Sequence, residues 1–463
     1  MTQTPTQAMT PAAPRPCSPS PSPSPIVELD AAHVWHPYTQ HGIAPTAVPI
    51  ARAEGAVLYD LAGRPIIDAI SSWWVTLHGH AHPAIAAAIA DQARRLEQVI
   101  FAGFTHEPAA ALAAELVRHL PAGLTRIFYS DNGSTAVEVA LKAALQYWRN
   151  RGQPRTRIAA LDHAYHGDTF GAMSASAASI FTEPFAELLF DVVRLPAPGS
   201  AEDDAALLAA LDRLLTTDGD PLAAVIVEPR LQGAGGMRVW RAETLRAVRD
   251  RTAAHDVLLI ADEVLTGFGR TGPTFACQGE SPATAIAPDI MCLSKGLTGG
   301  FLPMGVTAVR EELFEAFRSS DRRQTFFHGH SFTANPLACA AARASLALLD
   351  DDCAARRTAI ESAHRAQMRC WSTHPWVRDP RVLGTVAAFD LVAPAAEAGG
   401  YLHPIGRQLA DFAFDAGVLI RPLGDVVYVL PPYCITSDQL GQVYAVVTAF
   451  LERLEREGPV VAR

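Results

Sequence analysis

A lysine and an aspartate, each at the end of an apolar run, are the residues of this sequence best placed to act together in catalysis. Lys295 follows the run at residues 290–293 and precedes the pair Gly299-Gly300, and Asp262 ends the run that begins at residue 257. If both runs are strands of one parallel sheet, the two side chains emerge at the same edge, where open α/β sheets bind ligands. A lysine there can condense with a carbonyl group. Taken alone, Lys295 would be an ordinary surface lysine.

A turn rich in small polar residues follows a third apolar run. Residues 129–136 read Tyr-Ser-Asp-Asn-Gly-Ser-Thr-Ala and lead into a helical pattern that continues to Trp148. Free backbone N–H groups and the positive end of the helix dipole suit a phosphate at such a point, with Gly133, Ser134 and Thr135 as its contacts. The alternative is a helix N-cap without a ligand. Neither a Walker P-loop nor a Gly-x-Gly-x-x-Gly dinucleotide fingerprint is present.

An aromatic residue stands after another apolar run. Tyr165 lies in the segment Asp-His-Ala-Tyr-His-Gly at residues 162–167, and its ring could stack on a planar cofactor or simply pack against its neighbours. Together the four features provide a phosphate anchor, a ring face, an anion and an amine, which are the groups that pyridoxal 5'-phosphate requires. We therefore predict this cofactor. Lys295 must be neutral to act as a base, so we predict that its apolar, partly enclosed site lowers its pKa.

These residues require a sheet whose strand ends meet at one edge, and the apolar pattern predicts such a sheet. Helix-like segments separate most of the apolar runs, which lie at residues 126–129, 157–161, 225–227, 257–260 and 305–309. This alternation predicts an α/β fold with a mainly parallel sheet that is covered by helices on both faces. One covering helix is predicted from Pro108 to Leu120.

The length of 463 residues favours two structural units, because single cores rarely grow past about 250 to 300 residues. We predict a large cofactor-binding domain at residues 84–345. Residues 26–83, with an antiparallel pattern, and residues 346–463 are predicted to form a smaller α+β domain that ends in a helix at 437–454. Residues 1–25 are dominated by Pro, Ser and Thr and are predicted to be a disordered tail.

Composition excludes several classes of partner. The net charge is -10 and no basic block is present, so no nucleic-acid partner is expected. No apolar run is long enough to span a bilayer, and the N-terminus lacks the pattern of a signal peptide, so no membrane partner is expected. The seven cysteines are scattered and form no Cys-x-x-Cys pair, which indicates reduced thiols and a cytoplasmic location.

Three histidines at alternate positions raise the possibility of a metal site. His78, His80 and His82 would point to one side of a strand. No cysteine or carboxylate accompanies them closely in the sequence, and Pro83 ends the stretch. We predict no metal.

The sequence resembles the class III pyridoxal-phosphate aminotransferases in the segments that carry these residues. Residues 259–264 (Leu-Ile-Ala-Asp-Glu-Val), 267–272 (Gly-Phe-Gly-Arg-Thr-Gly) and 288–296, which run from Pro-Asp-Ile to Ser-Lys-Gly, look like the signature of that family. The likeness extends from about Val34 to Pro432. It implies the PLP-dependent transferase fold of type I and a homodimer whose active sites lie at the subunit interface.

The resemblance implies a role for each site residue. Lys295 would bind the cofactor covalently and move the proton, and Asp262 would pair with the pyridine nitrogen. Tyr165 would stack on the ring, and Gly133 and Ser134 would hold the phosphate. Lys295 and Tyr165 would also contact the substrate.

One segment farther along and one acid complete this set. Ser331, in His-Gly-His-Ser-Phe-Thr at residues 328–333, would reach the phosphate of the other subunit, and Gly329 would contact substrate. Glu228 would be an acid near the cofactor with a supporting role. His330 and Ser331 replace a common Pro-Thr pair of the family.

Three further segments resemble the branch of the family that serves biotin synthesis. They read Trp-His-Pro-Tyr-Thr at residues 35–39, Ser-Ser-Trp-Trp at 71–74 and Arg-Pro-Leu-Gly at 421–424. The keto acceptor of that branch is 8-amino-7-oxononanoate, a long apolar chain with a carboxylate at one end. Its usual amino donor is S-adenosylmethionine, while some relatives use lysine.

A pocket for this acceptor needs apolar walls and one cation. Tyr38, Trp73 and Trp74 would form the walls, and the Arg421 guanidinium would bind the carboxylate through two hydrogen bonds. Core packing is the alternative for the tryptophan pair, although two adjacent tryptophans on one strand would seldom both face inward. Leu423 stands where the family motif usually has phenylalanine.

Two other functions stay open from the sequence. One is a class III aminotransferase that acts on lysine, a diamine or an ω-amino acid. The other is a non-catalytic homologue that binds pyridoxal phosphate. The presence of both Lys295 and Asp262 argues against the second.

Overall fold

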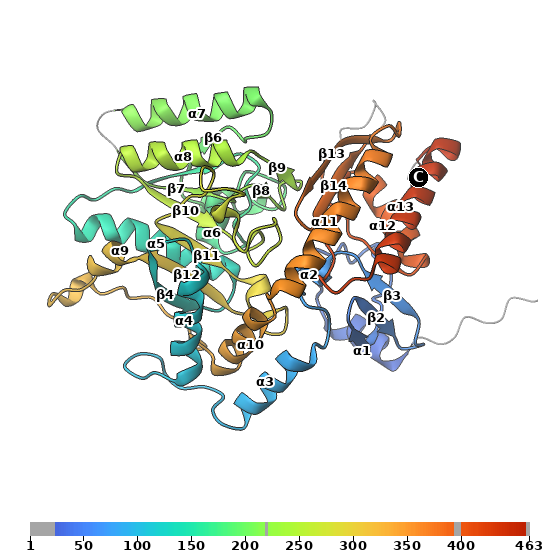
Figure 1. The fold of residues 1–463 in the computed structure, drawn as a ribbon, viewed down its shortest axis with the longest axis horizontal. Helices are drawn as coiled ribbons and strands as arrows, with labels where there is room; N and C mark the ends of the chain where they lie inside the picture. Colours follow the sequence, from blue (N-terminus) through green and yellow to red (C-terminus); the bar gives the residue numbers. More distant parts are fainter. Residues whose placement is uncertain (1–23, 218–220, 393–399, 460–463) are drawn as a thin grey trace, which may run out of the picture.

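A computed structural model describes residues 24–217, 221–392 and 400–459 (Figure 1). The predicted tail falls almost entirely outside these residues, and its last residue begins helix α1 (Pro25–His33). The chain forms two lobes in Figure 1, with the C-terminal helices and the N-terminal strands in one of them. Among the described residues, no helix is both long and apolar enough to cross a membrane.

A seven-stranded sheet forms the centre of the larger lobe. Its strand order is β4-β12-β11-β10-β7-β5-β6, and the strands are β4 (Leu124–Ser130), β5 (Arg157–Leu161), β6 (Val193–Leu195), β7 (Leu222–Val227), β10 (Leu258–Asp262), β11 (Ile290–Leu293) and β12 (Gly305–Arg310). The predicted fold class is confirmed, because only β12 runs antiparallel to its neighbours. Residues 294–304 are too short a connection for the crossover that a parallel β12 would need.

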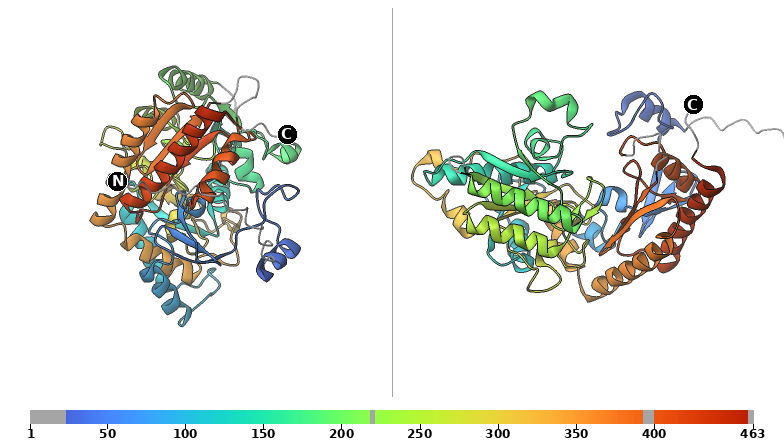
Figure 2. Two further views of the ribbon diagram at one scale, coloured as in Figure 1. Left: turned by 90° about the vertical axis from the view of Figure 1, so that its right-hand side faces the viewer. Right: turned by 90° about the horizontal axis from the view of Figure 1, so that it is seen from above.

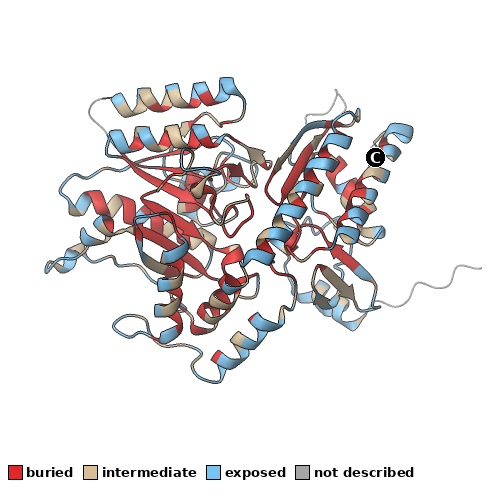
Figure 3. Ribbon diagram, in the orientation of Figure 1, coloured by how far each residue is buried: buried red, intermediate tan, exposed pale blue. Residues whose placement is uncertain are grey.

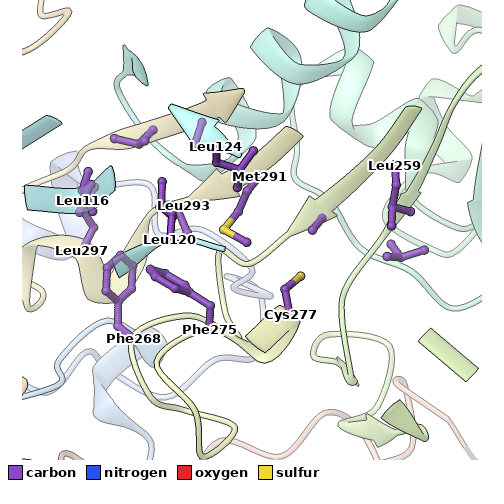
Figure 4. Close-up of a cluster of buried hydrophobic side chains, with 14 of the residues drawn as sticks. Leu116, Leu120, Leu124, Leu259, Phe268, Phe275, Cys277, Met291, Leu293 and Leu297 are labelled. Carbon is purple, nitrogen blue, oxygen red and sulfur yellow. The ribbon is translucent and has the colours of Figure 1, made fainter. Parts of the chain in front are cut away.

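Helices cover both faces of this sheet because the side chains of each strand alternate between the faces. Leu259 and Ala261 of β10 pack into the core under α4, α7, α8 and α10. Leu258 and Ile260 pack into the second core, under α5. Figure 4 shows part of the first core, and Figure 3 shows that the central strands are buried while the helices keep an exposed face.

The helix predicted from Pro108 to Leu120 is α4 (Glu107–His119), with Leu112 and Leu116 buried. The other helices of this lobe are α3 (Pro83–Ala93), α5 (Gly133–Asn150), α6 (Phe170–Ala175), α7 (Ala201–Thr216), α8 (Ala242–Ala254), α9 (Glu311–Glu315) and α10 (Pro336–Ala347). A two-stranded ribbon, β8 (Leu231–Gln232) and β9 (Arg238–Val239), follows β7.

Two small sheets and the helices α11, α12 and α13 form the other lobe, in which α1 also lies (Figure 1). One sheet has the order β1-β2-β3-β15 and the other β13-β14-β16. Their strands are β1 (Ile50–Glu54), β2 (Val57–Asp60), β3 (Pro65–Asp68), β13 (Val377–Leu383), β14 (Val386–Leu391), β15 (Val418–Leu419) and β16 (Val426–Val429), and the helices are α11 (Asp351–Trp371), α12 (Ile405–Asp415) and α13 (Ser437–Glu457).

The two ends of the chain meet in this lobe. The N-terminal strands β1, β2 and β3 are antiparallel, as predicted, and β3 pairs in parallel with β15 near the C-terminus. Ala56 and Ile67 share a core with Val418 and residues of α13, and Figure 2 shows the blue and red segments side by side. We propose that residues 26–83 and 346–463 form the smaller domain and residues 84–345 the larger one.

Two short stretches differ from the expected strands. Ser71–Trp74 forms the irregular turn α2, in which Ser72 has φ 59° and ψ -94°, so the tryptophan pair does not lie on a strand. In the stretch from His78 to His82, Ala81 has φ 52°, which breaks the extended backbone that would align three histidines.

Candidate active site

A cavity of about 650 Å³ opens at the carboxyl edge of the seven-stranded sheet. Six of the residues predicted from the sequence line it, namely Gly133, Ser134, Tyr165, Glu228, Asp262 and Lys295. They lie at or just after the ends of β4, β5, β7, β10 and β11, which are parallel to one another, so these ends meet at this edge. Asp262 is paired in register with Cys292 of β11, which brings it close to Lys295.

The first turn of α5 leaves backbone donors open to the cavity. Asn132 caps the helix, accepting a hydrogen bond from the Thr135 N–H, while the Thr135 hydroxyl bonds the backbone of Asn132. The N–H groups of Gly133 and Ser134 have no acceptor in the described part of the chain. Thr135 is therefore a capping residue, and its expected contact with phosphate is wrong.

Only glycine fits at the start of this turn. A Cβ atom on Gly133 would lie 2.8 Å from Cγ1 of Val264. At Gly167, which faces the turn, a Cβ atom would lie 2.2 Å from Oγ of Ser134. The two glycines keep space for an anion at the positive end of the α5 dipole.

Asp262 is a buried carboxylate held by two groups. His166 places Nδ1 2.7 Å from Oδ2 of Asp262, and the Val264 N–H donates to Oδ1 at 3.1 Å. The other ring nitrogen of His166 is buried without a partner among the described residues. Sequence reasoning missed His166, whose only signal was its place beside Tyr165 after β5.

Lys295 lies two residues after the end of β11 in a left-handed backbone conformation, with φ 44°. Its Nζ is 4.7 Å from the centre of the Trp74 ring. Burial lowers the pKa of Lys295 from 10.5 to about 8. The negative charges of Asp262 and Glu228 act in the other direction and offset part of this shift. The predicted direction of this shift is confirmed.

The reactivity of Lys295 in cofactor-free protein is expected to rise as the pH passes about 8, because its neutral amine predominates only above its pKa. Acetylation of the Lys295 peptide, measured by mass spectrometry across pH, tests this. In Asp262→Asn the midpoint should move to lower pH, because the Asp262 charge favours the protonated amine. A wild-type midpoint near the usual 10.5 would contradict the burial of Lys295.

Glu228 follows β7 and anchors the loop that carries Tyr165. Its carboxyl accepts the Tyr165 N–H and the Gly233 N–H, each at 3.1 Å. Burial, with the Asp262 charge nearby, raises the pKa of Glu228 well above its usual value. Glu228 lines the cavity, but its hydrogen bonds are to backbone.

Asp168 is a second residue of the cavity wall that the sequence analysis did not identify. It accepts a hydrogen bond from the Tyr38 hydroxyl, and its N–H donates to Ser134 Oγ at 3.2 Å. Burial and the bond to Asp168 raise the pKa of Tyr38 to about 12. Tyr38, which comes from the N-terminal segment, is thus linked through the hydrogen bonds of Asp168 to Ser134 in the first turn of α5.

Tyr38, Trp73 and Arg421 come together beside the cavity, although none of them lines it. The ring centres of Tyr38 and Trp73 are 5.5 Å apart, and the Arg421 guanidinium carbon lies 4.9 Å from the Trp73 ring. Trp73 is 43% exposed. Arg421 forms no ion pair within the described ranges.

The two adjacent tryptophans separate into two environments. Trp74 is buried, its Nε1–H donates to the Tyr428 hydroxyl at 3.0 Å, and its ring faces Lys295. Trp73 instead faces Tyr38 and Arg421. Core packing, the alternative considered for the pair, therefore describes Trp74 and not Trp73.

Gly329 and Ser331 do not line the cavity of their own chain. Both are exposed, and the Ser331 carbonyl accepts a hydrogen bond from the Gln98 side chain at 2.8 Å. The contact of Ser331 with the cofactor phosphate of another subunit and the contact of Gly329 with substrate therefore stay predictions.

Two of the three histidines expected to share one side of a strand have separate hydrogen-bond partners. His78 Nε2 lies 3.2 Å from Ser345 Oγ, and His80 Nε2 lies 2.8 Å from Asp68 Oδ2. Burial lowers the pKa of His78 to about 4. No group of three or more His, Cys, Asp or Glu side chains in the described residues could hold a metal ion.

The residues of the cavity fit pyridoxal phosphate. Free N–H groups at the α5 turn suit its phosphate, Asp262 suits a protonated pyridine nitrogen, and Lys295 suits its aldehyde. Tyr165 lines the same cavity and is available to cover the pyridine ring.

Comparisons with known proteins agree with this chemistry. The family model of aminotransferase class III matches residues 38–451. A relative from Synechococcus elongatus, described as adenosylmethionine-8-amino-7-oxononanoate aminotransferase, is 52% identical over 91% of this chain and 99% of its own length.

Solved structures match the fold over nearly the whole chain. An adenosylmethionine-8-amino-7-oxononanoate aminotransferase from Methanocaldococcus jannaschii has a TM-score of 0.86 and 32% identity, covering 93% of this chain and 98% of the other. An (S)-enantioselective omega-transaminase from Thermomicrobium roseum also has a TM-score of 0.86, with 29% identity and coverage of 93% and 98%.

Proposed function

This chain belongs to the class III aminotransferases, and from that premise we propose that it transfers an amino group to 8-amino-7-oxononanoate, forming 7,8-diaminononanoate in biotin synthesis. S-adenosylmethionine is the proposed amino donor. The observation that carries the proposal is the 52% identity, over 91% of the chain, to a relative described by this donor and this acceptor. The cofactor is pyridoxal 5'-phosphate and the fold is that of the type I transferases.

Pyridoxal phosphate supplies an electron sink for the electron pair that is left when a proton leaves the substrate carbon. The chain contributes the groups around it. Lys295 would hold the cofactor at its aldehyde carbon between turnovers, and its neutral amine, when free of that carbon, would take the substrate proton and return it. Asp262, oriented by His166 at 2.7 Å, keeps the pyridine nitrogen protonated.

The phosphate and the ring are held by separate parts of the chain. The N–H groups of Gly133 and Ser134 bind the phosphate at the α5 turn. Tyr165, whose backbone is fixed by Glu228, covers the ring. Lys295 and Tyr165 also contact the substrate.

The cluster of Tyr38, Trp73 and Arg421 is the proposed site for the acceptor chain. Two aromatic rings in contact provide an apolar wall, and Arg421 lies against one of them with its guanidinium free of a carboxylate partner in the described ranges. Leu423, the departure from the family motif, lines an adjoining cavity of about 280 Å³ together with Tyr165. Gly329 is the remaining proposed contact with substrate.

Arg421→Ala is expected to raise the KM for 8-amino-7-oxononanoate by about 10- to 100-fold, because a charge-assisted hydrogen-bond pair to a carboxylate is lost. The turnover number should fall much less. Steady-state kinetics with varied acceptor measures this, and Arg407→Ala, an exposed arginine of α12, is the control. An equal rise in the KM for an acceptor analogue without a carboxylate would contradict the proposed role of Arg421.

We also propose a homodimer with shared active sites. Ser331 would approach the cofactor phosphate of the second subunit. Phe327 and Phe332, on either side of Gly329 and Ser331, are 66% and 63% exposed, and such exposure of aromatic rings favours burial in an interface. Sedimentation velocity should give about twice the mass of 49.5 kDa.

A cytoplasmic location is proposed because the six cysteines of the described residues are unpaired.

One experiment separates the donors and the alternative functions. Purified protein with pyridoxal phosphate and 8-amino-7-oxononanoate is given S-adenosylmethionine, lysine or a simple ω-amine, and 7,8-diaminononanoate is measured by mass spectrometry. Product with S-adenosylmethionine supports the proposal, and product with lysine alone changes only the donor. Turnover of ω-amines without reaction of this acceptor would favour the function of the Thermomicrobium neighbour. No transamination with any pair would indicate a non-catalytic homologue.

A further inference from the structure

The turn that carries the tryptophan pair has an unfavourable backbone. Ser71, Ser72 and Trp74 have φ of 53°, 59° and 67°, in the left-handed region that residues other than glycine seldom adopt. Such conformations persist only where surrounding contacts hold them. This turn directs Trp73 towards Tyr38 and Trp74 towards Lys295.

Asp68 is a buried group that holds the backbone of this turn. Its side chain is fully buried at the end of β3 and accepts hydrogen bonds from the Ile70 N–H at 3.1 Å and the Ser72 N–H at 2.7 Å. Its own N–H donates to the Ala56 carbonyl at 2.8 Å. The carboxylate therefore links a fixed strand to the two backbone groups on either side of Ser71.

His80 completes the arrangement from the next segment. Its Nε2 lies 2.8 Å from Oδ2 of Asp68, the oxygen that also accepts from Ser72. The His80 backbone pairs with Gly55 in both directions, at 2.7 and 3.3 Å. The His80 side chain is 14% exposed, and no other ion pair to Asp68 occurs among the described residues.

We infer that Asp68 and His80 together are positioning residues that hold the 70–74 turn in its left-handed form and so set the place of Trp73 in the acceptor site. His80, considered as a metal ligand in the sequence, serves instead as a hydrogen-bond donor to a buried carboxylate. The inference rests on the proposed function for the role of Trp73 towards substrate. Its structural part, the control of the turn by Asp68 and His80, does not.

Asp68→Asn is expected to raise the KM for 8-amino-7-oxononanoate about tenfold and to change the turnover number less than about threefold, since a lost positioning contact weakens substrate binding more than chemistry. The amide cannot accept the Ser72 N–H at its nitrogen. The visible absorption of the bound cofactor should stay. Asp60→Asn is the matched control, because Asp60 accepts two backbone N–H groups in the neighbouring β2–β3 turn without contact to the tryptophans.

Two variants of His80 keep the test decisive if Asp68→Asn does not fold. His80→Phe removes the donor and should raise the KM for the acceptor, whereas His80→Gln keeps an N–H donor and should recover most of the wild-type value. Combining Asp68→Asn with Trp73→Ala should raise the KM no further than Trp73→Ala alone. Additive effects would show that Asp68 does not act through Trp73, and would overturn the inference.

A readout without substrate separates this inference from the proposed function. Protein labelled with 5-fluorotryptophan, with resonances assigned through Trp73→Phe and Trp74→Phe, should show shifted or broadened Trp73 and Trp74 signals in Asp68→Asn and His80→Phe, and unchanged signals in Asp60→Asn. Unchanged signals in the first two variants would overturn the inference. If wild-type protein fails to convert 8-amino-7-oxononanoate, the proposed function fails, while the fluorine spectra still test the turn.

Discussion

Lys295→Ala is expected to lose the visible absorption of the lysine-linked cofactor and to reduce transamination by about 10⁴-fold or more, because one side chain serves both as the covalent holder and as the base. Lys295 is the amine in the cavity whose pKa is lowered from 10.5 to about 8, so a much larger share of it is neutral near physiological pH than for an ordinary lysine. Absorption spectra with added pyridoxal phosphate and assays of product measure the two losses.

The composition of the chain provides a matched control for this variant. The sequence contains two lysines, Lys142 and Lys295. Lys142 is exposed on α5, with its Nζ 2.9 Å from His328 Nδ1. Borohydride reduction of the wild-type protein should place the cofactor on the Lys295 peptide and leave Lys142 unmodified, and Lys142→Ala should keep the absorption. A Lys295→Ala protein with both the visible band and full turnover would contradict the assignment.

Asp262→Asn is expected to bind pyridoxal phosphate and to lose turnover by about 10²- to 10³-fold, as for the removal of one charge that stabilises a transition state. The amide cannot hold a proton on the pyridine nitrogen, so the electron sink weakens. Binding should survive because the phosphate and Lys295 contacts lie elsewhere in the cavity. Turnover and cofactor affinity, measured on the same samples, separate the two effects.

Two companion variants sharpen this result. Asp250→Asn removes an exposed carboxylate of α8 that pairs with Arg246, and it should leave turnover unchanged. His166→Phe removes the group 2.7 Å from Asp262 and should lose less activity than Asp262→Asn. With ¹⁵N-labelled cofactor, the pyridine nitrogen should be protonated in wild-type protein and not in Asp262→Asn. A protonated nitrogen in the variant would contradict the role of Asp262.

Local sequence was sufficient to predict several residues of the cavity. Lys295, Asp262, Tyr165 and Gly133 each follow an apolar run, and the alternation of runs with helices indicated a parallel sheet. In a parallel sheet all carboxyl ends lie at one edge. Residues at those ends therefore converge even when the order of the strands is unknown.

Partners that depend on strand order could not be found in this way. His166 meets Asp262 because β5 and β10 both flank β7, and no local pattern specifies that order. Asp168 likewise meets Tyr38 across 130 positions of the chain. The antiparallel direction of β12, by contrast, agrees with the short connection at residues 294–304, which is a local feature of the chain.

The tryptophan pair shows most clearly what the local sequence specifies and what only the tertiary structure decides. The residue types at positions 71–74 predicted apolar walls, but a left-handed turn, held by Asp68 and His80, sends Trp74 into the core and Trp73 to Arg421. Residue types and the ends of apolar runs thus specify the chemistry, because they are local properties of the chain. Which side chains touch is decided by packing between segments distant in sequence, since only the folded chain brings β3, the His80 segment and the Arg421 loop to one place.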